Sequence, residues 1–559
     1  MEPQETVPFS SRNRADGIQR LSSSTFDLVV IGGGATGCGI ALDAASRGLK
    51  TALIEKRDFA SGTSSKSTKL IHGGLRYLKQ FDIPLVRETG TERAIVHRLA
   101  PHLVLPEKML LPLIQGGTYG KWATSFGLLV YDLLAGVEKE DRRKMLSKKA
   151  TLKLEPLLDE HTLKGSGFYA EYRTDDARLT IEMIKMAHQY GANALNYCEA
   201  IDFTYEKGLV NGLNCKDVLT GDTFTLRAKK VVSAGGPWVD RVRSLNGSLS
   251  GKRLHLTKGV HIVVPKAKLP LAHSIYFDVP DGRMIFAIPR GKITYVGTTD
   301  TTYTGRLDRV VVTKADANYL LEAVNNAFPD IHLKITDITS NWAGLRPLIH
   351  EEGKSPSELS RKDEIFISPS GLISIAGGKL TGYRKMAQRI VDLVAKELKA
   401  DSSQNFGPCQ TKELRLNANP FANAKAVQTY INRLEGAVKE VGLSAYHAWY
   451  LTTVYGKQAE AILEKMKDFS TDNARVALAR AEAWFTTTYE MVNSAADFFV
   501  RRTGRLYFDI ESIPAIETAV LSDFQSYLGW NEERLQKEKE GLEMLLYDAT
   551  HYYDADLTE

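Results

Sequence analysis

The spacing of hydrophobic positions in this chain changes near residue 400. Before that point, short apolar runs separated by turn residues predict strands that alternate with helices. The runs at 26–31 and 51–54 predict two buried strands, and the small-residue stretch between them predicts a helix that ends near residue 48. Further strand-like runs follow at 209–213, 229–234, 260–264 and 284–288.

After residue 410 the pattern is helical. Apolar residues recur there at spacings of three and four over 422–434, 457–467, 474–491 and 531–546. The stretch DSSQNFGPCQ at 401–410 has the composition of a linker. We therefore predict a flexible tail over 1–24, an α/β body over 25–400, a linker over 401–410 and a helical domain over 411–559.

A glycine-rich turn joins the first predicted strand to the first helix. Gly32, Gly34 and Gly37 form a G-x-G-x-x-G pattern, and Glu55 ends the second strand. Gly32 permits a tight turn, Gly34 lets N–H groups approach a diphosphate, and Gly37 lets the helix pack close to the strand. An acid that accepts hydrogen bonds from a ribose disfavours a 2′-phosphate. The motif therefore predicts FAD or NAD rather than NADP; a turn without a ligand is the alternative.

Composition limits the class of protein. The 559 residues suffice for two or three domains, and 43% hydrophobic with 25% charged residues is usual for a soluble globular chain. The four cysteines form no C-x-x-C pair, so we predict no metal site and a reduced, cytosolic setting without disulfides. Residues 1–25 are polar and lack the apolar core of a signal peptide. The longest apolar stretch, 126–137, is too short to span a bilayer and predicts a buried or interfacial helix.

Charge is distributed unevenly. The net charge of +5 divides into −8 over residues 401–559 and +13 over residues 1–400. A basic body suits an anionic ligand such as a flavin diphosphate or a phosphorylated substrate, and it also favours anionic lipid. No nucleic-acid-binding motif accompanies the charge, so we predict no nucleic-acid partner.

Three segments combine glycines, hydroxyls and cations. The stretch 61–77 is dense in all three, and its apolar end is unlike a free surface loop. We predict that segments 62–78, 233–238 and 375–384 converge on one site, as they would in a flavin domain with an inserted substrate domain.

These segments belong to a longer series of motifs in a fixed order. The series is Ile31-Gly32-Gly33-Gly34, Gly62-Thr63-Ser64-Ser65, Lys69-Leu70-Ile71-His72-Gly73-Gly74-Leu75-Arg76-Tyr77, Asp175-Asp176-Ala177-Arg178-Leu179, Gly236-Pro237-Trp238, Lys258-Gly259-Val260-His261, Gly297-Thr298-Thr299-Asp300, Gly344-Leu345-Arg346-Pro347-Leu348 and Gly377-Gly378-Lys379-Leu380-Thr381. Over residues 25–550 the chain resembles the FAD-dependent sn-glycerol-3-phosphate dehydrogenases of the aerobic, respiratory bacterial type. The resemblance implies the fold class of the amino-acid oxidase flavoproteins, α/β plus α: a Rossmann-like FAD domain, an inserted antiparallel-sheet substrate domain and a helical C-terminal cap.

The reaction of that family needs a base or proton relay, donors for a developing alkoxide and cations for a phosphate. Histidine titrates near neutrality and arginine presents a planar fork to phosphate. We predict catalytic roles for His261, His72, Arg346 and Lys379, and substrate contacts for Arg346, Arg76, Tyr77 and Lys379.

Structural roles compete with these assignments. His261 in an apolar run is also typical of a core histidine, Arg346 could pair with Glu351 or Glu352, and Lys379 could be a solvated turn lysine. We give Asp300 no role.

The motif and the resemblance together imply a cofactor site. The predicted residues are Gly32, Gly33, Gly34, Ala35, Thr36, Gly37, Glu55, Thr63, Ser64, Ser65, Lys69, Leu70, His72, Gly73, Gly74, Gly235, Gly378, Lys379, Leu380 and Thr381. A helix over 381–398 would direct its positive end toward the flavin pyrimidine edge.

The segment 497–506 carries three arginines among aromatic residues. Docking of the helical domain on the flavin domain, contact with anionic phospholipid and an ordinary helix end with exposed cations all remain open for it.

The function expected from the resemblance is oxidation of glycerol 3-phosphate to dihydroxyacetone phosphate by hydride transfer to FAD, with electrons passed to a quinone. Such a protein would be cytoplasmic, with peripheral contact to the inner face of an anionic membrane, and a homodimer is left open. The alternatives are a glycerol-3-phosphate oxidase that reduces oxygen to hydrogen peroxide, an amine or amino-acid oxidase of the same superfamily, and a non-catalytic protein with structural FAD.

Overall fold

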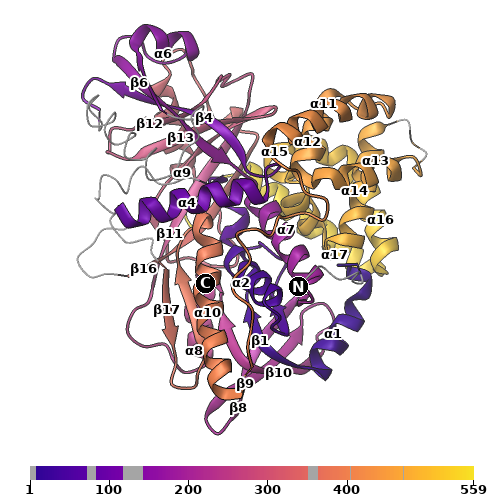
Figure 1. Ribbon diagram of the computed structural model, residues 1–559. Coiled ribbons are helices and arrows are strands. Elements are labelled where there is room, and N and C mark those ends of the chain that lie inside the picture. The colour runs from indigo at the N-terminus through magenta and orange to yellow at the C-terminus, as the bar shows by residue number, and fades with distance from the viewer. Residues whose placement is uncertain are drawn as a thin grey trace.

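The computed structural model describes residues 8–71, 83–117, 143–350, 363–402, 404–469, 471 and 473–558. In this part of the chain, two sheets lie next to each other and the helices that follow residue 410 form a group on one side of them, coloured orange to yellow in Figure 1.

The first sheet contains eight strands in the described ranges. They are β1 (Thr25–Ile31), β2 (Thr51–Ile54), β7 (Asn193–Leu195), β8 (Cys198–Glu206), β9 (Leu209–Asp217), β10 (Thr223–Ser233), β17 (Asp363–Ile367) and β18 (Ile373–Gly377). The central order β18-β10-β1-β2-β7 is parallel throughout, while β17, β9 and β8 add antiparallel pairs. This is the doubly wound arrangement expected of a dinucleotide-binding domain.

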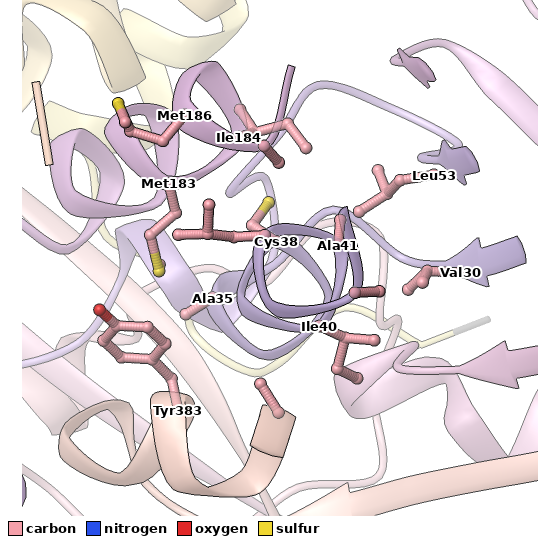
Figure 2. Close-up of a cluster of buried hydrophobic side chains, with 14 of the residues drawn as sticks. Val30, Ala35, Cys38, Ile40, Ala41, Leu53, Met183, Ile184, Met186 and Tyr383 are labelled. Atoms are coloured by element: carbon pink, nitrogen blue, oxygen red, sulfur yellow. The ribbon is translucent and has the colours of Figure 1, made fainter. Parts of the chain in front are cut away.

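Helix α2 (Ala35–Ser46) occupies the centre of this domain. Its small residues allow close packing against β1 and β2 on one side, and against α7 (Asp176–Gln189) and α10 (Tyr383–Ser402) on the others. Figure 2 shows the contacts around Cys38 and Ile40, with Met183 and Tyr383 contributed by the two neighbouring helices. The helix is therefore buried on nearly all sides, and its N-terminus has a fixed position.

The second sheet contains ten strands of the described chain. They are β3 (Leu70–Ile71), β4 (Leu105–Ile114), β5 (Lys144–Ser147), β6 (Leu163–Arg173), β11 (Leu254–Pro265), β12 (Ser274–Asp278), β13 (Met284–Arg290), β14 (Ile293–Gly297), β15 (Thr301–Thr302) and β16 (Ser340–Ile349). Every pair is antiparallel except β12 with β4. Strand β11 lies between β16 on one side and β14 with β15 on the other. The motifs at 258–261, 297–300 and 344–348 therefore lie side by side.

Helices surround the two sheets and form the last region. Beside the sheets lie α1 (Arg14–Ser23), α4 (Ile83–Leu99), α6 (Lys148–Leu154), α8 (Val239–Leu245) and α9 (Lys314–Ala327). The last region contains α11 (Ala424–Glu440), α12 (Ala445–Tyr455), α13 (Ala459–Met466), α14 (Ala474–Tyr489), a π-helix (Asp497–Arg502), α15 (Arg505–Phe508), α16 (Ile513–Leu528) and α17 (Glu532–Thr550). Within the described ranges, no helix combines the length and apolarity that a membrane crossing needs.

The flexible tail predicted over 1–24 is wrong for residues 8–24. Helix α1 is ordered because Phe9 and Leu21 are buried and the Arg14 guanidinium donates 2.6 Å to the carboxylate of Asp217. The polar composition of this segment does not indicate these contacts, because their partners lie far away in the chain.

Two other expectations differ from the structure, and a third is not tested by it. The linker predicted over 401–410 begins later, because α10 continues to Ser402. Helices α12 and α16 lie in the predicted helical domain but outside its four named segments; in α12, aromatic and β-branched residues typical of strands obscure the helical spacing. The apolar stretch 126–137 lies outside the described residues.

Candidate active site

A cavity of about 570 Å³ lies between the two sheets, where the carboxyl ends of the parallel strands meet β11 and β16. Its walls include residues of 61–68, 234–238 and 377–381. The predicted convergence of these three segments is therefore confirmed for their described parts.

The glycine-rich turn has the geometry that its sequence predicts. Gly32 has a φ of +110°, and a Cβ there would lie 2.6 Å from the carbonyl oxygen of Ala234. A Cβ on Gly37 would lie 1.9 Å from the carbonyl oxygen of Gly32. Any side chain at position 37 would therefore separate α2 from β1, as the interpretation of this glycine requires.

Glu55 and Ser64 organise the end of the cavity near α2. One Glu55 oxygen accepts from the Gly33 N–H at 2.7 Å and the other from the Arg57 N–H at 2.9 Å. Burial raises the pKa of the Glu55 carboxyl, while these backbone donors oppose that effect. The Ser64 hydroxyl accepts from the Ala35 N–H at 3.0 Å, at the first turn of the helix.

These residues fit a flavin dinucleotide. Each carboxylate oxygen of Glu55 has a further lone pair that can accept from a ribose hydroxyl. The N-terminus of α2 lines the cavity and suits a diphosphate. A Cβ on Gly236 would meet no atom within 4 Å, so the second turn leaves open space beside it. When bound here, FAD would supply the hydride-accepting chemistry of the site.

Most predicted cofactor residues line this cavity. They are Gly32, Gly34, Ala35, Thr36, Glu55, Thr63, Ser64, Leu70, Gly235, Gly378, Lys379, Leu380 and Thr381. Gly33, Gly37, Ser65 and Lys69 lie outside its lining, and the Lys69 ammonium instead donates to the Ser65 carbonyl and to Asp176 at 2.9 and 2.6 Å. His72, Gly73, Gly74, Arg76 and Tyr77 lie outside the described residues, so their roles stay predictions.

One face of the second sheet forms the opposite wall. In the β11–β16 register, His261 is opposite Trp342, Gly259 is opposite Gly344, and Thr257 is opposite Arg346. The backbone positions of His261 and Arg346 are thus four residues apart along the strand direction, which is about 13 Å. The space beside Gly344 is filled by the Lys66 backbone, since a Cβ there would lie 2.5 Å from the Lys66 carbonyl oxygen. A Cβ on Gly259 would lie 2.3 Å from Nη2 of Arg346, so the guanidinium lies over this glycine.

His261 is buried at this wall. Its ring stacks on Trp342 with centroids 4.7 Å apart, and a Cβ on Gly297 would lie 2.2 Å from its Cδ2 atom. Nε2 is 3.0 Å from the Thr68 hydroxyl, which lines the cavity, whereas Nδ1 has no hydrogen-bond partner among the described residues. Burial, with the charges of Arg346 and Lys69, holds the pKa of His261 well below its usual range. The imidazole is therefore neutral near pH 7, and burial with these two charges makes its protonation less favourable than in water.

Arg346 is held by the motif that contains Asp300. Its Nη1 donates to the Thr299 carbonyl at 3.1 Å and to Asp300 at 3.0 Å, and its Nη2 donates to the Thr298 hydroxyl at 2.9 Å. Asp300, to which we assigned no role from the sequence, thus orients Arg346, the predicted phosphate-binding residue. Glu351 and Glu352, the other proposed partners, lie outside the described residues.

Lys379 and Lys66 add positive charge to the cavity. Lys379 lines it directly before the turn Leu380–Gly382, which leads into α10 at Tyr383. Lys66 also lines it, and burial together with the charges of Arg57 and Arg501 lowers the pKa of Lys66 to about 8. Neither Lys66 nor Thr68 was singled out from the sequence, although both belong to the polar stretch 61–77.

The arginine-rich segment 497–506 docks the helical region next to the cavity. Asp58, three residues after Glu55, is fully buried and accepts from Arg501 at 2.6 Å and from Arg502 at 2.8 and 2.9 Å. The docking interpretation of this segment is confirmed, and its cations are buried rather than exposed.

Comparisons with known proteins agree with this geometry. A family model described as "FAD dependent oxidoreductase" matches residues 27–384, and one described as "C-terminal domain of alpha-glycerophosphate oxidase" matches residues 409–535. The aerobic glycerol-3-phosphate dehydrogenase of Bacillus subtilis is 49% identical over 544 residues, 97% of this chain and 98% of that protein. That of Staphylococcus aureus (strain MRSA252) is 48% identical over 536 residues, 95% of this chain and 96% of that protein.

Solved structures show the same relation. A glycerol-3-phosphate dehydrogenase from Bacillus halodurans, complexed with FAD, has a TM-score of 0.83 at 42% identity, covering 97% of this chain and 99% of that one. An L-alpha-glycerophosphate oxidase from Mycoplasma pneumoniae with FAD bound shares the fold at 19% identity and a TM-score of 0.55, over 71% of this chain and 100% of that one. The chain belongs to the aerobic glycerol-3-phosphate dehydrogenase family of FAD-dependent oxidoreductases.

Proposed function

We propose that this protein oxidises sn-glycerol 3-phosphate to dihydroxyacetone phosphate with FAD and passes the electrons to a quinone. The observation that carries the proposal is the second wall of the cavity. There an oriented guanidinium, Arg346, and a neutral imidazole, His261, occupy one face of a sheet opposite the dinucleotide-binding turn. The relatives named above act on the same substrate by name.

Arg346 would bind the phosphate group. Three hydrogen bonds to the Thr298–Asp300 loop orient its guanidinium. Little side-chain conformational freedom is therefore lost when an anion binds. Lys379 lines the same cavity and can add a second positive charge, either to the phosphate or to the pyrimidine edge of the flavin.

His261 would receive the hydroxyl proton of the substrate. Oxidation at C2 removes a hydride from carbon and a proton from the hydroxyl group. Only a neutral imidazole can take up that proton. The Thr68 hydroxyl is 3.0 Å from Nε2 and also lines the cavity, so it can carry the proton between substrate and ring. His72 remains the other proposed base.

The acceptor and the cellular setting are part of the proposal. A quinone resides in a membrane, so its reduction needs at least transient contact of a cytoplasmic protein with the membrane's inner face. The charge of +13 over residues 1–400 supports attraction to anionic lipid. A homodimer remains compatible with this arrangement.

Anaerobic reduction of the flavin tests the proposal. FAD-loaded protein is mixed with glycerol 3-phosphate, glycerol or an amino acid, and the flavin absorbance is followed. We expect glycerol 3-phosphate to bleach the flavin and the other two compounds to leave it yellow. The proposed reaction is contradicted if an amino acid bleaches the flavin, or if none of the three compounds does. Readmitted air then separates the acceptors, because fast recolouring with peroxide indicates an oxidase, whereas slow recolouring that a soluble quinone accelerates indicates the dehydrogenase.

A further inference from the structure

The segment after α17, residues 551–558, lies along the chain between β15 and α9. The Lys314 N–H donates to the Tyr553 carbonyl at 2.8 Å, and the Tyr553 N–H donates to the Val312 carbonyl at 3.1 Å. Farther along, the Arg306 N–H donates to the Leu557 carbonyl at 2.9 Å. The segment is therefore tied by backbone hydrogen bonds to the loop that follows Asp300.

An ion pair between the buried Lys258 and the partly exposed Asp556 joins the same segment to β11. The Lys258 ammonium lies 2.5 Å from Asp556 and 2.6 Å from Asp316, and Lys258 is only 2% exposed. Asp316 also accepts from the N–H and hydroxyl of Thr313 in the cap of α9, so its carboxylate is shared among several donors. Asp556 is thus the second carboxylate beside Lys258, and it is not shared with the donors of the α9 cap.

The backbone of Lys258 supports the site of Arg346. The Thr299 hydroxyl donates to the Lys258 carbonyl at 3.3 Å and accepts from the Val260 N–H at 3.0 Å. The carbonyl of Thr299 accepts from Nη1 of Arg346 at 3.1 Å. A continuous series of contacts therefore runs from Asp556 through Lys258 and Thr299 to Arg346, whose guanidinium lies over Gly259, the next residue on β11.

We infer that Asp556 is a positioning residue for Arg346, so that segment 551–558 sets the affinity of the site for the phosphate end of the substrate. The inference rests on the proposed function, in which Arg346 binds that phosphate. Because a phosphate contact has the same strength in the bound substrate and in the transition state, its loss raises KM and leaves kcat unchanged.

The test compares Asp556→Asn with Asp554→Asn in the FAD-loaded protein. Asp554 pairs with Lys314 at 2.8 Å on the exposed surface of the same segment, so its variant matches the charge change without contacting Lys258. Steady-state kinetics with glycerol 3-phosphate and a soluble dye acceptor give KM and kcat, and absorbance gives the FAD content. We expect Asp556→Asn to raise KM about 5-fold or more, equivalent to about 1 kcal/mol, with kcat and FAD content within about twofold of wild type.

Further variants separate positioning from general stabilisation. Asp556→Glu keeps the carboxylate and should restore most of the affinity, and Asp554→Asn should behave as wild type. An unchanged KM in Asp556→Asn overturns the inference, as does a variant that loses FAD or kcat in proportion to a lowered melting temperature. A wild-type protein that does not oxidise glycerol 3-phosphate refutes the proposed function instead, before any variant is compared.

Discussion

Replacement of Asp58 by asparagine tests whether burial decides the strength of the contact between the helical region and the flavin domain. The carboxylate accepts from Arg501 at 2.6 Å, from Arg502 at 2.8 and 2.9 Å, and from Asn196 at 2.9 Å. Burial alone would raise the pKa of Asp58, but the charges of the two arginines outweigh it and hold the pKa below its usual range. Asparagine keeps the shape, removes the charge and directs an amide donor at guanidinium donors.

The expected cost follows from the environment. Arg502 is also fully buried, and removal of one partner of a buried pair costs about 3–5 kcal/mol because the other charge remains desolvated. The free energy of unfolding of a domain is about 5–15 kcal/mol, so this loss is a large fraction of the total. The matched control is Asp392→Asn, since Asp392 also lies 2.6 Å from an arginine, Arg47, but is 54% exposed. Arg47 is buried but keeps Asp43 at 2.6 Å, so loss of the exposed Asp392 leaves no unpaired buried charge and should cost about 0–1 kcal/mol.

Urea unfolding of the FAD-loaded proteins measures both changes, with tryptophan fluorescence and flavin release as the two signals. Asp58→Asn should shift the midpoint by the equivalent of about 3 kcal/mol or more. Flavin release should shift with it, because Asp58 follows Glu55 by three residues. If the two variants differ by less than about 1 kcal/mol, the buried arginines are compensated by other groups and the argument from burial is refuted.

Other substitutions probe single features of the site. Gly37→Val should abolish bound flavin at purification while far-ultraviolet circular dichroism persists, because its Cβ would lie 1.9 Å from the Gly32 carbonyl oxygen; a yellow variant protein would disprove this. Arg346→Lys, which keeps the charge without the fork, should raise KM for glycerol 3-phosphate by about tenfold, measured by steady-state kinetics with kcat as the comparison. His261→Asn should slow anaerobic flavin reduction by about 10²–10⁴-fold with FAD retained, and a change below tenfold would assign the proton to another group. Burial lowers the pKa of His102 to about 3, so the unfolded state alone takes up this proton below pH 6.5 and stability falls with pH; His102→Asn should lose about 1 kcal/mol less stability than wild type between pH 7 and 5.5 in urea unfolding.

The parts of the fold that depend on local pattern could be predicted from the sequence. The strand Thr51–Ile54 has the predicted bounds, and β1 begins one residue earlier than predicted, because buried parallel strands are continuous apolar runs. Gly32 and Gly37 could also be assigned individually, since each answers a steric demand within a few residues or next to the adjacent strand. Local chemistry was sufficient in both cases.

The parts that depend on distant partners could not be predicted. Asp300 has no distinctive local pattern, and its role follows only from the sheet register that places Arg346 beside it. The sequence could not decide among the three interpretations of segment 497–506. Its arginines are buried because they pair with Asp58, which lies more than 440 positions earlier in the chain. Thr68 was likewise one hydroxyl among several until the structure placed it against His261.

The excess of positive charge in the first 400 residues does not by itself identify an anion site. Several cations of that region are already paired in the interior, as in Arg47 with Asp43 and Lys69 with Asp176. What indicates an anion is the cavity lining, where six basic side chains face four acidic ones among the described residues. At Lys66, burial and then the charges of Arg57 and Arg501 lower the pKa to about 8. A cation in such surroundings is stabilised by a bound anion, so the site favours the diphosphate of FAD and a phosphorylated substrate over neutral ligands of the same size.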